Sequence, residues 1–365
     1  MQQQLIFTNS PGRAVDNVLA KAGVLTADRS AAPGRVFVIA DVNTAAYVLP
    51  ELRRQSRTLA DATLITVKAG DVNKNIDAAQ AIWRELDRGG ATRRSVVVNV
   101  GGGVVTDLGG FAAATFMRGI RAVNVPTTLL AAVDASVGGK TGINFGGIKN
   151  EIGTFTEPLA SVISTCFFAT LPPREMLSGY GEMLKHALLR GGDALARLLE
   201  YSPDTADIAP DRLLALIEDS VAVKREVVEA DFRESGRRKV LNLGHTAGHA
   251  FEALSLKRQS PLPHGYAVAH GLVVALVLSY LRFGYPQARV HQLADYVRMH
   301  YGTLSFTCDD YPALLALMSH DKKNTAADRF NFVRLDADGR PHIDEATTPD
   351  EVRNALDIYR DLTGI

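Results

Sequence analysis

The segment SVVVNVGGGVVTDLGGFAAATF, residues 95–116, joins an apolar β-branched run to a glycine-rich turn and a run of small and aromatic residues. This order predicts a strand, a turn and a helix, in which glycines let the backbone approach a phosphate and the helix N-terminus offers unpaired N–H groups. The fingerprint is imperfect, because Thr106 stands at its third glycine position and Pro126-Thr127-Thr128, without an acid, follows the next strand. We expect a pyrophosphate site with Asp41 as the candidate ribose contact, and a tight turn without a ligand is the alternative.

Short β-branched runs alternate with longer helical patterns on both sides of this segment. Residues 35–40, 62–67, 121–125 and 161–165 predict strands, and residues 75–88 carry apolar side chains at helical spacing. Such alternation is typical of a parallel sheet wound with helices.

Beyond residue 171 the pattern changes to successive helical segments. The helix candidates are residues 178–200, 211–230, 242–254, 265–283 and 288–300, and RFNFVRL at 329–335 is a late strand signal. Leu171-Pro172-Pro173 interrupts the pattern close to the change. The expected fold class is α/β plus all-α, with a Rossmann-like parallel-sheet domain over residues 1–168 and a helical domain over residues 169–365.

The composition argues against several classes of protein. Forty Lys and Arg balance forty Asp and Glu over 365 residues, so no excess charge favours nucleic acid or an anionic membrane. Cys166 and Cys308 are too few for a disulfide framework, which fits a reducing compartment. The longest apolar stretch, residues 268–281, is too short to span a bilayer, and no secretion signal is evident. We expect a soluble, cytoplasmic protein.

A second glycine-rich segment, residues 133–142, contains Gly-Gly-Lys-Thr but is not a P-loop, because Ala135 stands at the required first glycine. Lys140 could still meet a phosphate, and Lys149-Asn150 adds donors nearby. The alternative is a polar surface loop without a ligand.

Four residues are candidates for a metal site. His245 and His249 are spaced i, i+4 on one predicted helix, His264 opens the next one, and Glu182 lies in GYGEMLK. Thr246 excludes the metalloprotease motif, which needs Glu there. A carboxylate with two or three histidines could hold zinc and leave a position open for substrate oxygens. Each histidine taken singly would more often be structural or solvated. Histidines without this setting are not expected in a site, among them His186, His270, His300, His320 and His342.

These motifs, in this order, resemble those of the 3-dehydroquinate synthase family of sugar-phosphate cyclases. The matching segments are GGGVVTDLGGFAAATFMRG (101–119), VPTTLLAAVDASVGGKTGIN (125–144), KNEIGTF (149–155), LPPRE (171–175), GYGEMLKHALL (179–189), LNLGHTAGHAFE (241–252), HGYAVAHG (264–271) and DKKN (321–324).

The resemblance implies an NAD site in the N-terminal domain, one divalent metal, zinc or cobalt, in the C-terminal domain, and an active site in the cleft. It assigns the metal to Glu182, His245 and His264, so that His249 faces the substrate. It places cofactor contacts at Asp41, Asp71, Val72, Asn73, Lys74, Gly103, Val104, Val105, Thr106, Asp107, Thr127, Thr128, Lys140, Lys149, Phe167, Phe168, Ala169 and Thr170. It places catalytic and substrate contacts at Arg118, Asp134, Lys140, Asn150, Lys185, Lys224, Arg238, Asn242, His249 and Lys322 or Lys323.

The implied reaction converts 3-deoxy-D-arabino-heptulosonate 7-phosphate into 3-dehydroquinate and phosphate, the second step of the shikimate pathway to aromatic amino acids. NAD takes a hydride from C5, phosphate leaves by elimination, the hydride returns, and an aldol closure forms the ring. Alternatives are a sedoheptulose 7-phosphate cyclase, a metal-dependent alcohol or glycerol dehydrogenase, and a non-catalytic nucleotide-binding module. Arg238, Asn242 and His249 resemble the set of the enzymes with a carboxylate substrate.

The position of Arg118 bears on the oligomeric state of the protein. It follows the helix of the phosphate cradle, which carries it roughly 20 Å from the cradle. In the family this arginine reaches the substrate phosphate of the neighbouring subunit, so the resemblance implies a homodimer with a shared site.

Overall fold

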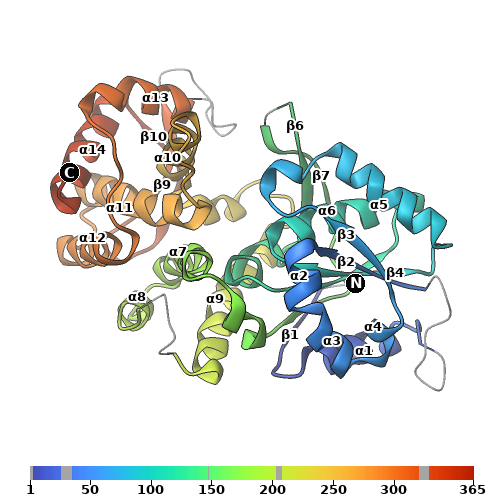
Figure 1. Ribbon diagram of the computed structural model, residues 1–365. Coiled ribbons are helices and arrows are strands. Elements are labelled where there is room, and N and C mark those ends of the chain that lie inside the picture. Colours follow the sequence, from blue (N-terminus) through green and yellow to red (C-terminus); the bar gives the residue numbers. More distant parts are fainter. Residues whose placement is uncertain (1–2, 26–34, 147, 203–207, 320–328) are drawn as a thin grey trace. The chain divides into compact units, whose positions relative to one another are not determined.

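The computed structural model describes the chain except residues 1–2, 26–34, 147, 203–207 and 320–328. It divides into two compact units (Figure 1). Unit 1 comprises Met1–Leu171 and Ala209–Val221, and unit 2 comprises Pro172–Ile208 and Ala222–Ile365. Each unit is considered by itself.

Unit 1 is built on a six-stranded sheet, as the β-branched runs predicted. The strands are β1 (Gln4–Phe7), β2 (Val36–Asp41), β3 (Thr63–Val67), β4 (Val96–Gly101), β5 (Arg121–Pro126) and β8 (Ala160–Ile163), in the order β1-β8-β5-β4-β2-β3. Every pair in it is parallel. Only β1 was not predicted, because it is short and only partly buried.

The strand order shows at which edge of the sheet a ligand is expected to bind. The chain passes from β2 to β3 on one side and returns to β4 on the other side of β2, so the connections diverge between β2 and β4. In parallel sheets, ligands bind outside the carboxyl ends of strands at such a point. Asp41 ends β2 and Gly101 ends β4, which places both sequence candidates at this edge.

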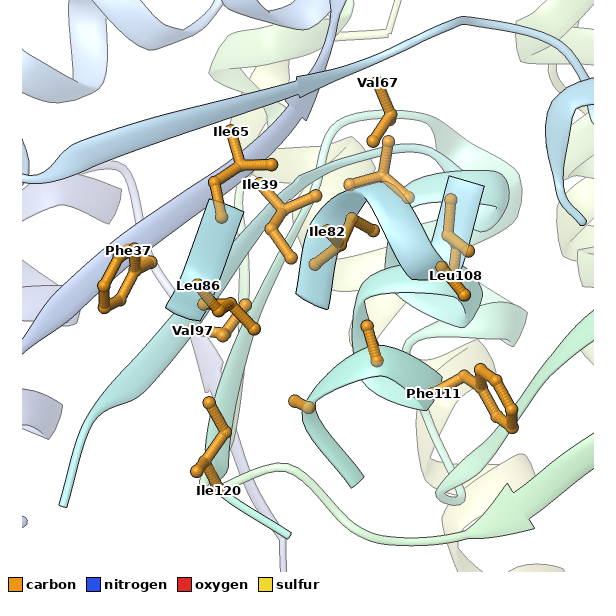
Figure 2. Close-up of a cluster of buried hydrophobic side chains, with 14 of the residues drawn as sticks. Phe37, Ile39, Ile65, Val67, Ile82, Leu86, Val97, Leu108, Phe111 and Ile120 are labelled. Carbon is orange, nitrogen blue, oxygen red and sulfur yellow. The ribbon is translucent and has the colours of Figure 1, made fainter. Parts of the chain in front are cut away.

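Helices cover both faces of the sheet (Figure 1). They are α1 (Pro11–Lys21), α2 (Val42–Tyr47), α3 (Leu49–Gln55), α4 (Arg57–Ala60), α5 (Ile76–Arg88) and α6 (Gly103–Thr115). Figure 2 shows the core between the sheet and α5 and α6, where Ile82 and Leu86 meet Phe37 and Ile39. Gly109 lets α6 approach β4, because a Cβ there would lie 2.0 Å from the side-chain oxygen of Asn99.

The alternative of a polar surface loop over residues 133–142 is wrong, because only residues 136–139 lie between regular elements and they are buried. Residues Ala131–Ala135 form a π-helical turn, and β6 (Lys140–Phe145) pairs antiparallel with β7 (Ile148–Phe155). Glycines hid the strand pattern, but Ile143 is buried in the core of unit 1 and anchors the hairpin.

Unit 2 is mainly helical. Its elements are α7 (Pro173–Arg190), α8 (Ala194–Leu199), the second part of α9 (Pro210–Ala230), α10 (His245–Lys257), α11 (His264–Phe283), α12 (Gln287–Tyr301), α13 (Tyr311–Ser319), β9 (Phe330–Leu335), β10 (Pro341–Thr347) and α14 (Pro349–Thr363). β9 and β10 form an antiparallel pair within this otherwise helical unit.

The single helix predicted over residues 178–200 is wrong. Gly191 and Gly192 have φ angles of +75° and +59°, a left-handed conformation that ends α7 before α8 begins. α13 and α14 were not predicted.

α11 is the central helix of unit 2 and the one helix, among the residues described, that is long and apolar enough to cross a membrane. The argument from the length of the apolar stretch therefore fails, since the helix extends beyond it to 20 residues. Nearly all side chains from Ala267 to Ser279 are fully buried within the protein, as expected for the core helix of a globular unit.

Glycines let α11 pack closely against its neighbours. A Cβ on Gly265 would lie 1.7 Å from the carbonyl oxygen of Ser178 in α7, and one on Gly271 would lie 2.0 Å from that of Gly244, which precedes α10. Gly181 and Gly248 have similarly little room, with backbone oxygens 2.2 and 2.8 Å from a Cβ. These contacts bring the first residues of α10 and α11 to the middle of α7.

Gly271→Ala should therefore destabilise the protein, because the added methyl group must push α11 away from the backbone that precedes α10. We expect the free energy of unfolding to fall by about 1–3 kcal/mol, as for other overpacked cores, measured by urea denaturation. Gly103→Ala, in α6, is the control, since its Cβ would meet only the Cβ of Ala135 at an ordinary contact distance of 3.4 Å. Equal midpoints for both variants would contradict the packing argument.

Candidate metal centre and cofactor edge

The four sequence candidates for metal ligands come together in unit 2. Glu182 lies in the middle of α7 and is fully buried, while His245 and His264 are the first residues of α10 and α11. The ligand atoms of His245, His249 and His264 lie within 4.8 Å of one another. Oε1 of Glu182 is 3.4 Å from Nε2 of His245 and 3.3 Å from Nε2 of His264.

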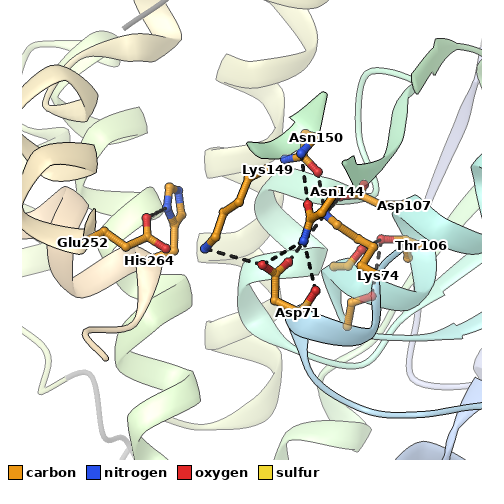
Figure 3. Close-up of polar contacts among 11 residues, drawn as sticks. Asp71, Lys74, Thr106, Asp107, Asn144, Lys149, Asn150, Glu252 and His264 are labelled. Carbon is orange, nitrogen blue, oxygen red and sulfur yellow. Dashed lines mark hydrogen bonds and ion pairs between the residues drawn. The ribbon is translucent and has the colours of Figure 1, made fainter. Parts of the chain in front are cut away.

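Hydrogen bonds fix the tautomers of the two histidines nearest to Glu182. Nδ1 of His245 lies 3.2 Å from the carbonyl oxygen of Leu243, and Nδ1 of His264 lies 3.2 Å from Oε2 of Glu252 (Figure 3). Both oxygens accept hydrogen bonds, so each Nδ1 carries a proton and donates it. In the neutral rings, each Nε2 then presents a lone pair.

Both lone pairs face Oε1 of Glu182, which is a third acceptor. This oxygen is buried and has no hydrogen-bond donor among the residues that the structure describes. Three acceptors that converge in a buried place repel one another unless a cation lies among them. Ligands bound at ~2.0–2.1 Å to a tetrahedral zinc lie about 3.3–3.4 Å apart, and Oε1 of Glu182 lies at this distance from Nε2 of each histidine. The donor set of one carboxylate and two imidazoles therefore fits zinc or a similar divalent ion.

The electrostatics of the cluster agree with this fit. Burial opposes ionisation of Glu182, but Lys185 and His245 outweigh it and hold the pKa of this carboxyl well below its usual range. Burial and Lys185 lower the pKa of His245, which favours a neutral ligand. Burial also lowers the pKa of His264, but Glu182 and Glu252 outweigh it and raise this pKa to about 10. Nε2 of His264 thus faces a site that attracts positive charge, whether from a proton or from a metal ion.

The other polar candidates of unit 2 are largely buried. Lys185 touches Glu182 one turn along α7, Lys224 lies in α9, and both are almost fully buried. Of the adjacent arginines, Arg238 is 2% exposed and donates from Nη1 to the carbonyl oxygen of Phe232 at 2.6 Å. Arg237 is instead exposed and pairs with Glu226. Asn242 donates to Glu234 at 3.3 Å.

Asp231 is assigned no role by the sequence motifs, although it shapes the turn before Arg238. Its carboxylate accepts from the backbone N–H groups of Ser235, Gly236 and Arg238 at 3.0, 2.7 and 3.0 Å. The bonds from Arg238 and Gly236 lower the pKa of Asp231 most strongly. Asp and Gly both favour turns, so the pair at positions 231 and 236 is the sequence signal for this turn.

The glycine-rich turn of unit 1 has the form that the sequence predicted. β4 ends at Gly101, Gly102 caps α6, and no side chain bonds to the cap. The first N–H groups of a 13-residue helix thus point toward the carboxyl edge of the sheet. Asp41 also lies there, but its carboxylate accepts from the N–H groups of Asn43 and Thr44 and so caps α2.

Several predicted cofactor residues form one polar network in unit 1 (Figure 3). Nζ of the buried Lys74 lies 3.0 Å from Asp107 and 2.5 Å from Oδ1 of Asn150. Lys149 pairs with Asp71 at 3.6 Å, and Asn144 donates to the carboxylate and carbonyl of Asp71. Two predicted segments, residues 71–74 and 149–150, therefore meet beside α6.

The remaining candidates are spread over unit 1. Thr127 and Thr128 follow β5, residues 167–170 belong to a 3-10 turn, Asp134 lies in the π-helical turn, and Lys140 is exposed at the start of β6. Arg118 is exposed, with a φ of +67°. Lys322 and Lys323 lie outside the described residues.

Solved structures share this fold. A 2-deoxy-scyllo-inosose synthase complexed with carbaglucose-6-phosphate, NAD+ and Co2+ matches with a TM-score of 0.81 at 21% identity, over 96% of this chain and 95% of that one. ValA, a 2-epi-5-epi-valiolone synthase from Streptomyces hygroscopicus with NAD+ and Zn2+ bound, matches with a TM-score of 0.74 at 24% identity, over 90% and 91% of the chains. The chain therefore shares the fold of these two synthases.

Comparison of the sequence with known families and proteins identifies the family of this chain. Family models described as 3-dehydroquinate synthase N-terminal and C-terminal match residues 64–178 and 179–324. The 3-dehydroquinate synthase of Parabacteroides distasonis is 44% identical over 331 residues, which cover 91% of this chain and 93% of the relative. That of Leptospira interrogans is 37% identical over 88% of both. The chain belongs to the 3-dehydroquinate synthase family, as the motifs predicted.

Metal binding can be tested without turnover. After chelation and reloading with zinc, we expect one zinc ion per chain in the wild type and little in Glu182→Gln or His264→Ala, because each loses one of three converging ligands. Atomic emission after dialysis gives the ratio. His342→Ala, which alters a histidine of β10 paired with Asp336, should bind zinc normally. Full zinc occupancy in His264→Ala would show that the ion lies elsewhere.

Proposed function

We propose that this protein is a 3-dehydroquinate synthase, which converts 3-deoxy-D-arabino-heptulosonate 7-phosphate into 3-dehydroquinate and phosphate. The observation that carries this proposal is that unit 2 holds the candidate metal ligands together with three almost fully buried cations, Lys185, Lys224 and Arg238. Lysine and arginine are seldom buried to this degree, and Lys185 is paired with Glu182. The proposed substrate carries both a carboxylate and a phosphate, and such anions need cations that are fixed in place.

In this proposal, residues 1–168 bind NAD and residues 169–365 bind the metal and substrate. Glu182, His245 and His264 hold the ion, while the N-terminus of α6 and the network around Lys74 receive the cofactor. When bound, NAD supplies a hydride acceptor and the metal supplies a positive charge beside the substrate hydroxyls. His249 and Asn242 donate hydrogen bonds that orient the substrate phosphate, which removes the proton itself before it leaves. The setting would be the shikimate pathway in the cytoplasm.

A sedoheptulose 7-phosphate cyclase is the second candidate, because the solved neighbours include synthases with other names. The first candidate is favoured because a relative that is 44% identical over 91% of this chain is named 3-dehydroquinate synthase. A glycerol dehydrogenase shares the fold at a TM-score of 0.64 and 14% identity. A dehydrogenase would make NADH in proportion to product, whereas the proposed synthase would return the hydride in each cycle.

Phosphate release tests the proposal. Purified protein with zinc and a trace of NAD should release phosphate from the heptulosonate substrate over many turnovers, because the hydride is returned in each cycle. Deuterium placed at C5 should be retained in the product, as measured by mass spectrometry. Sedoheptulose 7-phosphate is the comparison substrate and should react poorly. NADH that accumulates with product, or loss of the label, would instead support a dehydrogenase.

We also propose that the protein is a homodimer in which Arg118 completes the site of the partner. Met117, Arg118 and Gly119 all have positive φ, at +49°, +67° and +114°. Such strain in residues other than glycine tends to occur where function requires it. The hairpin of unit 1 also exposes Phe145, Ile148, Ile152 and Phe155 by 38–56%, an apolar surface that a second copy would cover.

Mixing two inactive variants tests this shared site. Arg118→Ala and His245→Ala should each lack activity, but a mixed dimer would contain one site with both residues intact. Activity should therefore appear only after subunit exchange, at up to about a quarter of the wild-type level from random pairing of equal amounts. If mass spectrometry shows exchange and the mixture stays inactive, Arg118 acts within its own chain.

A further inference from the structure

Glu252 is a buried carboxylate to which the sequence motifs assign no role. It lies in α10, two helical turns after His245, and is 8% exposed. Oε2 of Glu252 is 3.2 Å from Nδ1 of His264, which is the first residue of the next helix (Figure 3). The contact thus joins α10 to a candidate metal ligand on α11.

We propose that Glu252 is a positioning residue that holds the His264 ring and its tautomer so that Nε2 presents a lone pair to the metal. This inference rests on the proposed metal role of His264. A histidine ligand generally donates its second ring N–H to an acceptor, which orients the ring and makes the ligand more basic. Glu252 is the acceptor with the required position, because Nε2 of the same ring faces Glu182 at 3.3 Å.

His264 needs such support more than His245 does. Its side chain is 30% exposed, against 11% for His245, so packing restrains it less. The hydrogen bond from Nδ1 to the Glu252 carboxylate therefore contributes more to the orientation of this ring.

The backbone before His264 is already anchored, so the remaining freedom belongs to its side chain. The carbonyl oxygen of Pro261 accepts from Arg174 at 2.7 Å, and the N–H of Leu262 donates to Ser255 at 3.0 Å. Oγ of Ser255 in turn donates to the carbonyl oxygen of Glu252 at 2.6 Å. The turn that delivers His264 and the residue that orients it are therefore tied together.

Zinc affinity tests this inference in the absence of substrate. Competition with a chromophoric chelator should show roughly 10-fold weaker zinc binding for Glu252→Gln, which keeps the size but loses the charge, and a loss of up to about 100-fold for Glu252→Ala. Glu252→Asp should fall between the wild type and Glu252→Ala. Glu226→Gln, which alters an exposed carboxylate paired with Arg237, is the matched control and should bind zinc like the wild type.

Two further readouts separate positioning from a general structural role. The thermal midpoint of metal-free Glu252→Gln should match that of the metal-free wild type, and the visible spectrum of the cobalt-loaded variant should change, because the ligand field reports the orientation of His264. Wild-type zinc affinity in a folded Glu252→Gln, together with an unchanged cobalt spectrum, would overturn the inference. So would a wild type that binds no zinc. A wild type that binds zinc but releases no phosphate would refute only the proposed reaction.

Discussion

The absence of a side chain at a few glycines determines whether the candidate metal centre can exist. Glu182, His245 and His264 are separated by 63 and 19 residues, and nothing local in the chain holds them together. They meet because Gly265 passes α7 and Gly271 passes the start of α10 at distances that exclude a Cβ. The ligand geometry is therefore a result of helix packing, and the buried apolar length of α11 supplies the free energy that maintains it.

That packing has an electrostatic cost, because it brings ionisable groups into a place with little water. Glu182 is fully buried beside Lys185, and two imidazoles turn their Nε2 atoms toward the same carboxylate oxygen. A buried charge with incomplete partners is strongly unfavourable, and a cation at this place would remove much of the penalty. Ion binding and the stability of unit 2 should thus be coupled, since a ligand that binds only the folded state stabilises it.

The sheet and the main helices could be predicted from the sequence because their signals are local. β2, β4 and β5 are β-branched runs, and the glycine turn after β4 has a clear motif. The failures have physical causes as well. Glycines in and around β6 masked its alternation, and two left-handed glycines divided α7 from α8. Glu252 could not be found from its spacing, because its partner His264 lies 12 residues away across a turn whose path only the structure shows. Likewise, the contact between Lys74 and Asn150 joins residues 76 positions apart, and only the fold shows it.

The two histidines that flank Glu182 differ in how they can change during evolution. His245 is oriented by the carbonyl oxygen of Leu243, and every amino acid supplies that atom, so no substitution at position 243 removes it. His264 is oriented by a side chain, which a single codon change can replace. The orientation of His245 is thus insensitive to substitution at position 243, whereas the orientation of His264 depends on the residue at position 252. Drift at position 252 could alter the strength with which an ion is retained while all of its direct ligands remain the same.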